Sequence, residues 1–267
     1  MSRQLAQSAR KRFGQNFLVD GRVIDAIVAS INSSPNDSVV EIGPGHGAIT
    51  SGLYSSGCDL TLIELDRDLV PNLLASFVSK SPNRCRLINQ DALTVDFGRL
   101  GTQLRIVGNL PYNIGTPLLF RLLEHVGQIK DIHVMLQKEV VSRIAATPGN
   151  SAYGRLSVMI QATSSVKPLF DVSPESFTPA PKVESCVIRI IPNMSKRVRI
   201  QCMDTLTDLV RQSFGQRRKT LRNNLKGIIS LEEFDYLEIN PQGRPEQLSV
   251  DTYIELGNYI ARQRGTA

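Results

Sequence analysis

Short apolar runs alternate with helix-length segments through the first two thirds of the chain, and this alternation constrains the fold most. Five runs of this kind occupy residues 39–42, 60–63, 86–88, 104–107 and 132–136. Strands separated by helices form parallel βαβ units, because a parallel connection must cross the sheet. Residues 167–170 and 183–191 are strand-like and are expected near the end of the same sheet. The sequence therefore predicts an α/β fold with an open, seven-stranded sheet, preceded by an amphipathic helix at about residues 20–31.

The pattern changes after Pro192 and Asn193, which end the last predicted strand. From Ile200 onward, apolar residues such as Leu206, Leu209 and Phe214 follow helical spacing. We therefore expect two domains, a larger α/β domain at residues 1–197 that carries a basic N-terminal arm and a small all-helical domain at residues 198–267.

Positive charge is concentrated in two segments of the chain. The sequence has 31 Lys and Arg against 25 Asp and Glu, a net charge of +6. Residues 1–22 have a net charge of +4 and residues 196–226 of +7, so the remaining chain is net −5. Such clusters suit phosphate contacts, because each neutralised phosphate releases counterions. The alternative interpretation is a solvated helix face.

Several classes of protein are unlike this composition. No apolar run approaches the roughly 18 residues of a membrane helix, and no apolar segment follows the basic N-terminus as in a signal peptide. The cysteines are widely spaced, without a CxxC pair, which argues against a disulfide framework and a structural metal site; they are Cys58, Cys85, Cys186 and Cys202. We expect a cytoplasmic protein with no membrane partner and no metal.

A glycine-rich loop, residues 43–48, follows the first strand of the predicted sheet. Glycines let the backbone turn sharply and lie against a ligand at the carboxyl edge of an α/β sheet. Glu64, at the end of the next strand, is placed to accept hydrogen bonds from ribose hydroxyls, and Asp91 is placed to accept one from an adenine amine. The loop also satisfies the G-x-G-x-x-A dinucleotide pattern, which leaves dehydrogenase and methyltransferase nearly level, and an unliganded tight turn is a third alternative. Pro44 and Gly47 slightly favour S-adenosylmethionine.

The fourth strand leads into a second loop, Asn109-Leu110-Pro111-Tyr112, at the same edge of the sheet. The Asn109 side-chain oxygen and the Leu110 carbonyl can accept the two N–H hydrogens of an adenine amine, which frees the lone pair of its nitrogen. Pro111 fixes the turn that aims this carbonyl, and Tyr112 can stack on the base. The loop therefore favours methyl transfer to an amino group on a base, and an ordinary Asn-Pro turn is the structural alternative.

The sequence resembles the ribosomal RNA small-subunit adenine N6,N6-dimethyltransferase family, which is also called the kasugamycin-resistance dimethylase family. The resemblance covers nearly the whole chain and rests on motif blocks in the family's order. They are residues 9–18, 41–45, 63–66, the Asn109 loop, 135–139, 177–183 and 214–223. It implies a Rossmann-like class I S-adenosylmethionine methyltransferase sheet with a small C-terminal helical domain.

The resemblance also implies roles for individual residues. Cofactor contacts are implied for Asn16, Leu18, Gly43, Glu64, Asp91 and Asn109. Tyr112 and Phe177 are implied to sandwich the target adenine, whereas from the residues alone Phe177 is better explained as a loop anchor packed on the core. The block 214–223 resembles the family's rRNA-binding helix. With the charge clusters it makes the predicted RNA-binding residues Arg10, Lys11, Arg12, Arg217, Arg218, Lys219 and Arg222.

The implied activity is transfer of four methyl groups to two adjacent adenosines in the 3′-terminal hairpin of small-subunit (16S) rRNA, with a role in rRNA processing and ribosome biogenesis. The implied partner is small-subunit rRNA in an immature 30S subunit, and we expect a monomer. A large-subunit resistance methylase is the alternative among enzymes, although the basic block at residues 214–223 argues against it. A non-catalytic assembly factor is the alternative from another class, and a dehydrogenase is the weakest.

Overall fold

The computed structural model describes residues 15–216 and 218–265, which belong to two compact units. The sheet unit is Met1–Val141 with Lys167–Pro192, and the helical unit is Ser142–Val166 with Asn193–Ala267. The predicted division at residue 197 stays a prediction. The two units differ from the predicted division chiefly in residues 142–166. These residues belong to the helical unit, because the buried side of their helix at residues 155–161 packs on the C-terminal helices.

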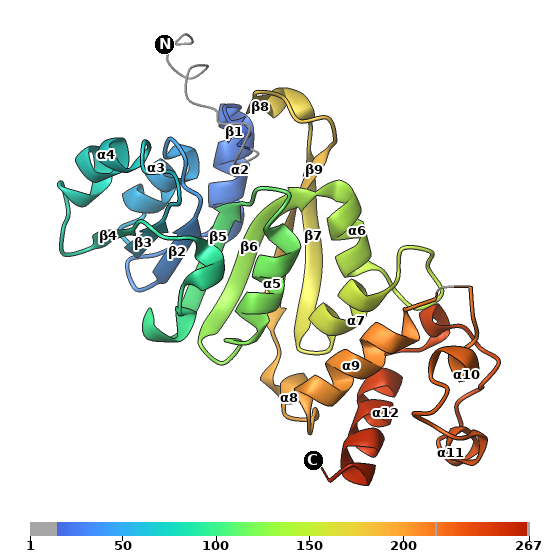
Figure 1. Ribbon diagram of the computed structural model, residues 1–267. Coiled ribbons are helices and arrows are strands. Elements are labelled where there is room, and N and C mark those ends of the chain that lie inside the picture. Colours follow the sequence, from blue (N-terminus) through green and yellow to red (C-terminus); the bar gives the residue numbers. More distant parts are fainter. Residues whose placement is uncertain (1–14, 217, 266–267) are drawn as a thin grey trace. The chain divides into compact units, whose positions relative to one another are not determined.

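The sheet unit contains a seven-stranded sheet with the order β4-β3-β2-β5-β6-β9-β7 (Figure 1). Its strands are β2 (Ser38–Ile42), β3 (Asp59–Ile63), β4 (Cys85–Ile88), β5 (Leu104–Asn109), β6 (Ile129–Gln137), β7 (Ser164–Val172) and β9 (Ser185–Pro192). The strands from β4 to β6 pair in parallel, and β9 pairs antiparallel with β6. The predicted α/β sheet is confirmed, and each predicted run overlaps one of these strands.

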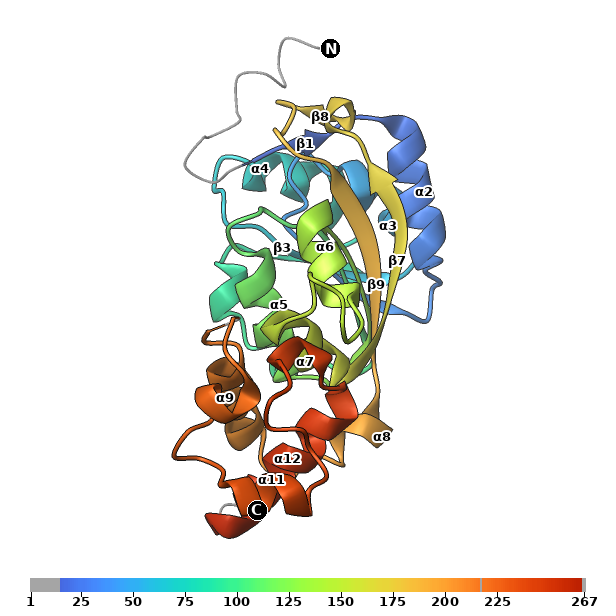
Figure 2. The same ribbon diagram turned by 90° about the vertical axis from the view of Figure 1, so that its right-hand side faces the viewer.

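Helices cover both faces of this sheet, with α2 and α3 on one side and α5 on the other (Figure 2). The helices are α2 (Gly21–Ile31), α3 (Ala48–Ser55), α4 (Val70–Leu73), α5 (Gly115–Leu123) and α6 (Lys138–Ala145), with a π-helical turn at Leu74–Val78 and 3-10 turns at Ala92–Thr94, Phe97–Arg99 and Pro174–Ser176. The predicted helix at residues 20–31 is α2, which begins where the Asp20 side chain accepts a hydrogen bond from the Arg22 N–H.

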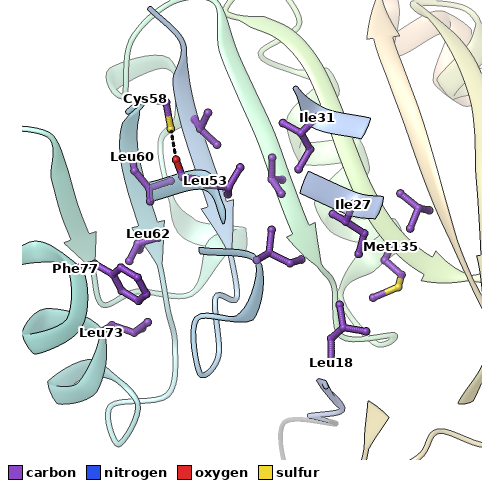
Figure 3. Close-up of a cluster of buried hydrophobic side chains, with 14 of the residues drawn as sticks. Leu18, Ile27, Ile31, Leu53, Cys58, Leu60, Leu62, Leu73, Phe77 and Met135 are labelled. Carbon is purple, nitrogen blue, oxygen red and sulfur yellow. Dashed lines mark hydrogen bonds between the residues drawn. The ribbon is translucent and has the colours of Figure 1, made fainter. Parts of the chain in front are cut away.

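The apolar side of α2 and α3 forms the core on one face of the sheet (Figure 3). Ile27 and Ile31 of α2 and Leu53 of α3 lie with Leu60 and Leu62 of β3 in this cluster. The Cys58 thiol is buried and donates to the Leu53 carbonyl, and all four cysteines are free thiols. Burying one Leu or Ile side chain contributes about 1.5–3 kcal/mol, so the cluster holds α2 and α3 firmly on the sheet.

The order in which the chain adds strands to the sheet changes direction between β2 and β5. From β2 the chain passes to β3 and β4 on one side and then returns to β5 and β6 on the other. Gly108 of β5 lies so close to β2 that a Cβ atom there would be 2.6 Å from the Ile42 carbonyl oxygen. Ligands of open α/β sheets bind at such a switch point, beyond the carboxyl ends of the strands.

A separate two-stranded sheet joins two distant segments. Strand β1 (Phe17–Leu18) pairs antiparallel with β8 (Phe177–Thr178), which brings Phe17 opposite Thr178 and Leu18 opposite Phe177. The sequence analysis missed this pairing, because two-residue strands carry no periodicity.

A buried guanidinium ties α2 to the amino-terminal ends of the central strands. Arg105 of β5 donates two hydrogen bonds to the Asp131 carboxylate, at 2.9 and 3.0 Å, and one to Asp37 at 3.1 Å. It also donates to the carbonyl oxygens of Ile31 and Asn32 at the end of α2. Its carboxylate partners keep Arg105 charged although it is only 5% exposed.

The helical unit is built from α7 (Arg155–Gln161), α8 (Met194–Arg197), α9 (Met203–Ser213), α10 (Leu221–Asn224), α11 (Leu231–Tyr236) and α12 (Val250–Gln263), with a 3-10 turn at Pro245–Gln247. Helices α9 and α12 approach closely, since a Cβ atom at Gly257 would be 3.3 Å from Leu206. The Phe214 ring packs between Tyr153 and Tyr253, with centroid distances of 6.3 and 5.8 Å. None of the helices in the described part of the chain has the length and apolar character needed to cross a membrane.

We expect Arg105→Ala to lower the free energy of unfolding by about 3–5 kcal/mol, because it removes two hydrogen bonds from the buried Asp131 carboxylate and leaves Asp37 with Lys130 as its remaining charged partner. Urea unfolding of both proteins measures the difference. The exposed pair of Arg99 with Asp96 provides the matched control, and Arg99→Ala should cost less than about 1 kcal/mol. Equal losses in the two variants would contradict a structural role for the buried cluster.

Candidate functional site

A cavity of about 250 Å³ lies beyond the carboxyl ends of β2, β3 and β5, at the switch point of the sheet. All predicted catalytic and cofactor-binding residues line this one cavity, from segments far apart in the sequence. They are Asn16, Leu18, Gly43, Glu64, Asp91, Asn109, Leu110, Pro111, Tyr112 and Phe177.

The glycine loop forms one wall of the cavity with a left-handed backbone. Gly43, Gly45 and Gly47 have φ angles of 67°, 60° and 86°, which side chains other than glycine rarely adopt. A Cβ atom at Gly45 would also be 3.2 Å from the Phe17 ring. A side chain at these positions would strain the loop. Because the glycines have none, the loop backbone itself is open to a ligand in the cavity.

The carboxylate of Glu64 is buried and held by backbone donors. Its Oε2 accepts a hydrogen bond from the Gly45 N–H at 3.1 Å, and its Oε1 accepts one from the Asp66 N–H at 2.8 Å. Burial raises the pKa of Glu64 above its usual range, while these two donors oppose the increase. The side chain is thereby fixed in one orientation at the end of β3.

Asp91 is oriented by the 3-10 turn that it caps. Its Oδ1 accepts a hydrogen bond from the Leu93 N–H at 2.9 Å, at the start of Ala92–Thr94. This contact holds the carboxylate at the cavity wall beyond β4.

Glu41 is a cavity residue to which the sequence analysis gave no role. It is 1% exposed, and its Oε2 has no hydrogen-bond partner in residues 15–216 and 218–265. Burial raises the pKa of Glu41 to about 7, and the nearby Glu64 carboxylate adds to the increase. Its place in the block 41–45 was visible in the sequence, but its burial was not.

The described wall of the cavity is acidic. It contains the carboxyl groups of Glu41, Glu64, Asp66 and Asp91, and no Lys or Arg lies among its described residues. A pyrophosphate would be repelled by such a wall, whereas a ligand with a sulfonium and an ammonium group would be attracted. The donor set therefore fits S-adenosylmethionine and argues against the dinucleotide alternative.

The Asn109 side chain is fixed by the segment that precedes β1. Its Nδ2 donates a hydrogen bond to the Asn16 carbonyl oxygen at 3.0 Å. No hydrogen bond from the described residues reaches Oδ1, so the amide presents an acceptor at the cavity. The next residue, Leu110, is buried and donates from its N–H to the Met135 carbonyl of β6 at 3.2 Å.

The two aromatic residues of the predicted base site both line the cavity but are held differently. The Tyr112 hydroxyl shares a hydrogen bond of 3.1 Å with the Ser185 hydroxyl at the start of β9. Phe177 is 4% exposed and belongs to the apolar cluster of the sheet unit, as its interpretation as a core anchor expects, although it also lines the cavity.

One further wall residue, Gln15, and one hydrogen-bond partner of a wall residue, Ser185, were missed individually. The Gln15 side chain donates to Asp66 Oδ2 at 3.1 Å, which joins the start of the described chain to the end of β3. Ser185 was missed because serine near a strand start is common, and nothing in its sequence context indicates a contact with Tyr112.

The predicted RNA-binding residues that the structure describes are not part of this cavity wall. Arg10, Lys11, Arg12 and Arg217 fall outside the described residues, whereas Arg218, Lys219 and Arg222 are exposed in the helical unit. The prediction that residues 214–223 form one helix is wrong, because α9 ends at Ser213 and α10 covers only Leu221–Asn224. Phe214 turns inward to pack on Tyr153 and Tyr253, which ends the helical path.

Comparison with known proteins identifies the family. Residues 6–262 match the family described as ribosomal RNA adenine dimethylase. The chain belongs to the ribosomal RNA adenine dimethylase family. It is 48% identical over 266 residues to ribosomal RNA small subunit methyltransferase A of Pseudomonas fluorescens, covering 98% of both chains. It is also 48% identical to the protein of that name from Hahella chejuensis, covering 96% of this chain and 94% of the relative.

Solved structures agree on the fold of this dimethylase. A dimethyladenosine transferase from Plasmodium falciparum has a TM-score of 0.82 at 23% identity, covering 93% of this chain and 98% of that chain. The 23S rRNA methyltransferase ErmE has a TM-score of 0.68 at 21% identity, covering 92% and 99%. The predicted family, fold class, enzyme class and cofactor are confirmed.

The Glu41 carboxyl makes the stability of the dimethylase depend on pH. Its pKa of about 7 in the folded protein exceeds the ordinary 4.5, so between these values the folded state binds more protons than the unfolded state. Its contribution to stability is therefore lost as pH rises through this range, by up to about 1.4 kcal/mol per pH unit. Urea midpoints of Glu41→Gln relative to the parent should improve from pH 5 to pH 7 and then level off. A constant difference between the two proteins would refute the buried, neutral carboxyl.

Proposed function

We propose that this chain transfers methyl groups from S-adenosylmethionine to the exocyclic amines of two adjacent adenosines in the 3′-terminal hairpin of small-subunit rRNA. The enzyme class follows from the family, since the chain is an S-adenosylmethionine-dependent rRNA adenine dimethyltransferase. The small subunit as target rests on the names of the 48% identical relatives, and the hairpin rests on the family resemblance.

The orientation of the Asn109 amide carries the proposed chemistry. An adenine amine is a weak nucleophile, because its lone pair is delocalised into the ring. With Nδ2 occupied by the Asn16 carbonyl, Oδ1 is the atom of Asn109 that faces an incoming N–H donor. Accepting that hydrogen bond, together with one at the Leu110 carbonyl, draws the amine nitrogen toward tetrahedral geometry and frees its lone pair.

The remaining cavity residues bind the cofactor and orient the target base. S-adenosylmethionine, when bound, supplies a methyl group on a positively charged sulfur. Glu64 accepts hydrogen bonds from the ribose hydroxyls, Asp91 accepts from the cofactor's adenine, and the glycine loop with Asn16 and Leu18 encloses it. Tyr112, anchored by Ser185, and Phe177 hold the target base between their rings, and Pro111 fixes the turn that aims the Leu110 carbonyl.

We also propose the setting in which the enzyme works. The exposed basic residues Arg218, Lys219 and Arg222 of the helical unit contact rRNA phosphates, joined by Arg10, Lys11, Arg12 and Arg217. The partner is an immature 30S subunit in the cytoplasm, and the enzyme acts as a monomer in ribosome biogenesis.

Glu64→Ala should weaken S-adenosylmethionine binding at least about tenfold, because the ribose hydroxyls lose a buried, charged acceptor. Isothermal titration without RNA measures this affinity. Glu184→Ala removes an equal charge from an exposed residue outside the cavity wall and serves as the matched control. Unchanged affinity in Glu64→Ala would reject the assignment of the ribose site.

Asn109→Ala should slow methyl transfer by about 10²–10³-fold, because the lost contact is strongest when the amine becomes tetrahedral. Single-turnover rates on small subunits from a strain lacking the enzyme, at saturating S-adenosylmethionine, isolate the chemical step. Mass spectrometry of the rRNA identifies the methylated adenosines.

Two comparisons make the Asn109 result decisive. The exposed Asn83, at the turn before β4, provides the control Asn83→Ala, which should keep the parent rate. Affinity for the subunits should be nearly unchanged in Asn109→Ala. A rate within about threefold of the parent would mean that the loop only shapes the cavity, and methylation at another rRNA site would reject the proposed target.

A further inference from the structure

One side chain organises the described part of the turn between α9 and α10, residues 216 and 218–222. The Asn224 Oδ1 accepts a hydrogen bond from the Gln216 N–H at 3.1 Å. Its Nδ2 faces three carbonyl oxygens, those of Gln216, Lys219 and Thr220, each at 3.2 Å. The amide therefore replaces backbone pairing that a continuous helix would have supplied to Gln216, Lys219 and Thr220.

The far end of the turn is fixed as well. The N–H groups of Leu221 and Arg222 donate to the carbonyl oxygens of Gly243 and Pro241, at 2.8 and 3.0 Å. Leu221 and Leu225 are fully buried, which anchors α10 in the helical unit. The backbone of Gln216 and of residues 219–222 is thus held by hydrogen bonds before any ligand binds.

The side chains on this turn carry positive charge that the described chain leaves unneutralised. Arg218, Lys219 and Arg222 are exposed, and no acidic residue in the described part of the chain forms an ion pair with them. Two other arginines of the helical unit form ion pairs, Arg199 with Asp251 at 2.7 Å and Arg211 with Asp208 at 2.8 Å. Free cations on an ordered backbone suit a polyanion with regularly spaced charges.

We propose that Asn224 is a positioning residue that holds a preformed phosphate-binding turn, in which Arg218, Lys219 and Arg222 meet the backbone of the RNA substrate. The proposal rests on the proposed function, because it assumes that the partner is rRNA. Fixing the backbone of even one residue costs the equivalent of about tenfold in affinity. A turn that is already ordered avoids this cost when RNA binds.

The test compares full-length parent and Asn224→Ala for binding to small ribosomal subunits from a strain lacking the enzyme. Affinity should fall about tenfold in Asn224→Ala, whereas S-adenosylmethionine affinity stays constant. The salt dependence of binding should keep its slope, because all cations remain, and Arg218→Ala with Lys219→Ala and Arg222→Ala should reduce that slope. Asn150→Ala is the matched control, since Asn150 holds a turn without basic residues through a hydrogen bond from the Ala152 N–H at 2.8 Å.

A double-mutant cycle separates positioning from general damage to the fold. When the three basic residues are already alanine, Asn224→Ala should weaken the affinity for subunits by less than a further factor of about two, because Asn224 acts through those residues. An equal loss in both backgrounds, or parent-like binding of Asn224→Ala, would overturn the proposal. If Asn224→Ala does not fold, Asn224→Gln is measured in its place and the same outcomes apply. Glutamine keeps the amide but carries it on a longer side chain, so the amide misses its backbone partners. A parent protein that binds no subunits would instead reject the proposed function.

Discussion

The close approach of β2 and β5 is the constraint on which the rest of the site depends. Only a residue without a side chain fits where Gly108 faces the Ile42 carbonyl oxygen. This contact brings the glycine loop beyond β2 next to the Asn109 loop beyond β5, so that the walls proposed for the cofactor and for the substrate share one cavity. A wider spacing would separate the donor of a methyl group from its acceptor, and no rearrangement of loop side chains would compensate.

Acidic residues of the cavity and basic residues of the turn before α10 lie on different surfaces of the protein. The cavity has an acidic described wall, in which carboxyl groups such as Glu64 and Asp91 suit the cationic cofactor proposed for it. Exposed basic residues are displayed elsewhere, on the turn that Asn224 holds. Each surface therefore favours one ligand and disfavours the other, because the acidic wall repels phosphates and the basic turn repels a cation.

Sequence patterns predicted those features that depend on neighbours along the chain. Apolar runs located the strands, and the Gly43 and Asn109 loops located the cavity, because parallel strands bring their carboxyl ends to one edge. The pairing of β1 with β8, the contact of Ser185 with Tyr112 and the association of residues 142–166 with the C-terminal helices depend on tertiary packing, so no local pattern indicated them. The expected helix over residues 214–223 was wrong, because α9 ends where Phe214 packs between Tyr153 and Tyr253, a tertiary contact that no local pattern indicated.

The pairing of β1 with β8 has a thermodynamic consequence. Leu18, an implied cofactor contact, and Phe177, an implied contact of the target base, lie opposite each other in one small sheet. Because residues in contact contribute to stability non-additively, substitutions at Leu18 and Phe177 are expected to have coupled effects on the free energy of unfolding. The wall of the cavity is held at this point by a pairing between two segments that lie far apart in the sequence.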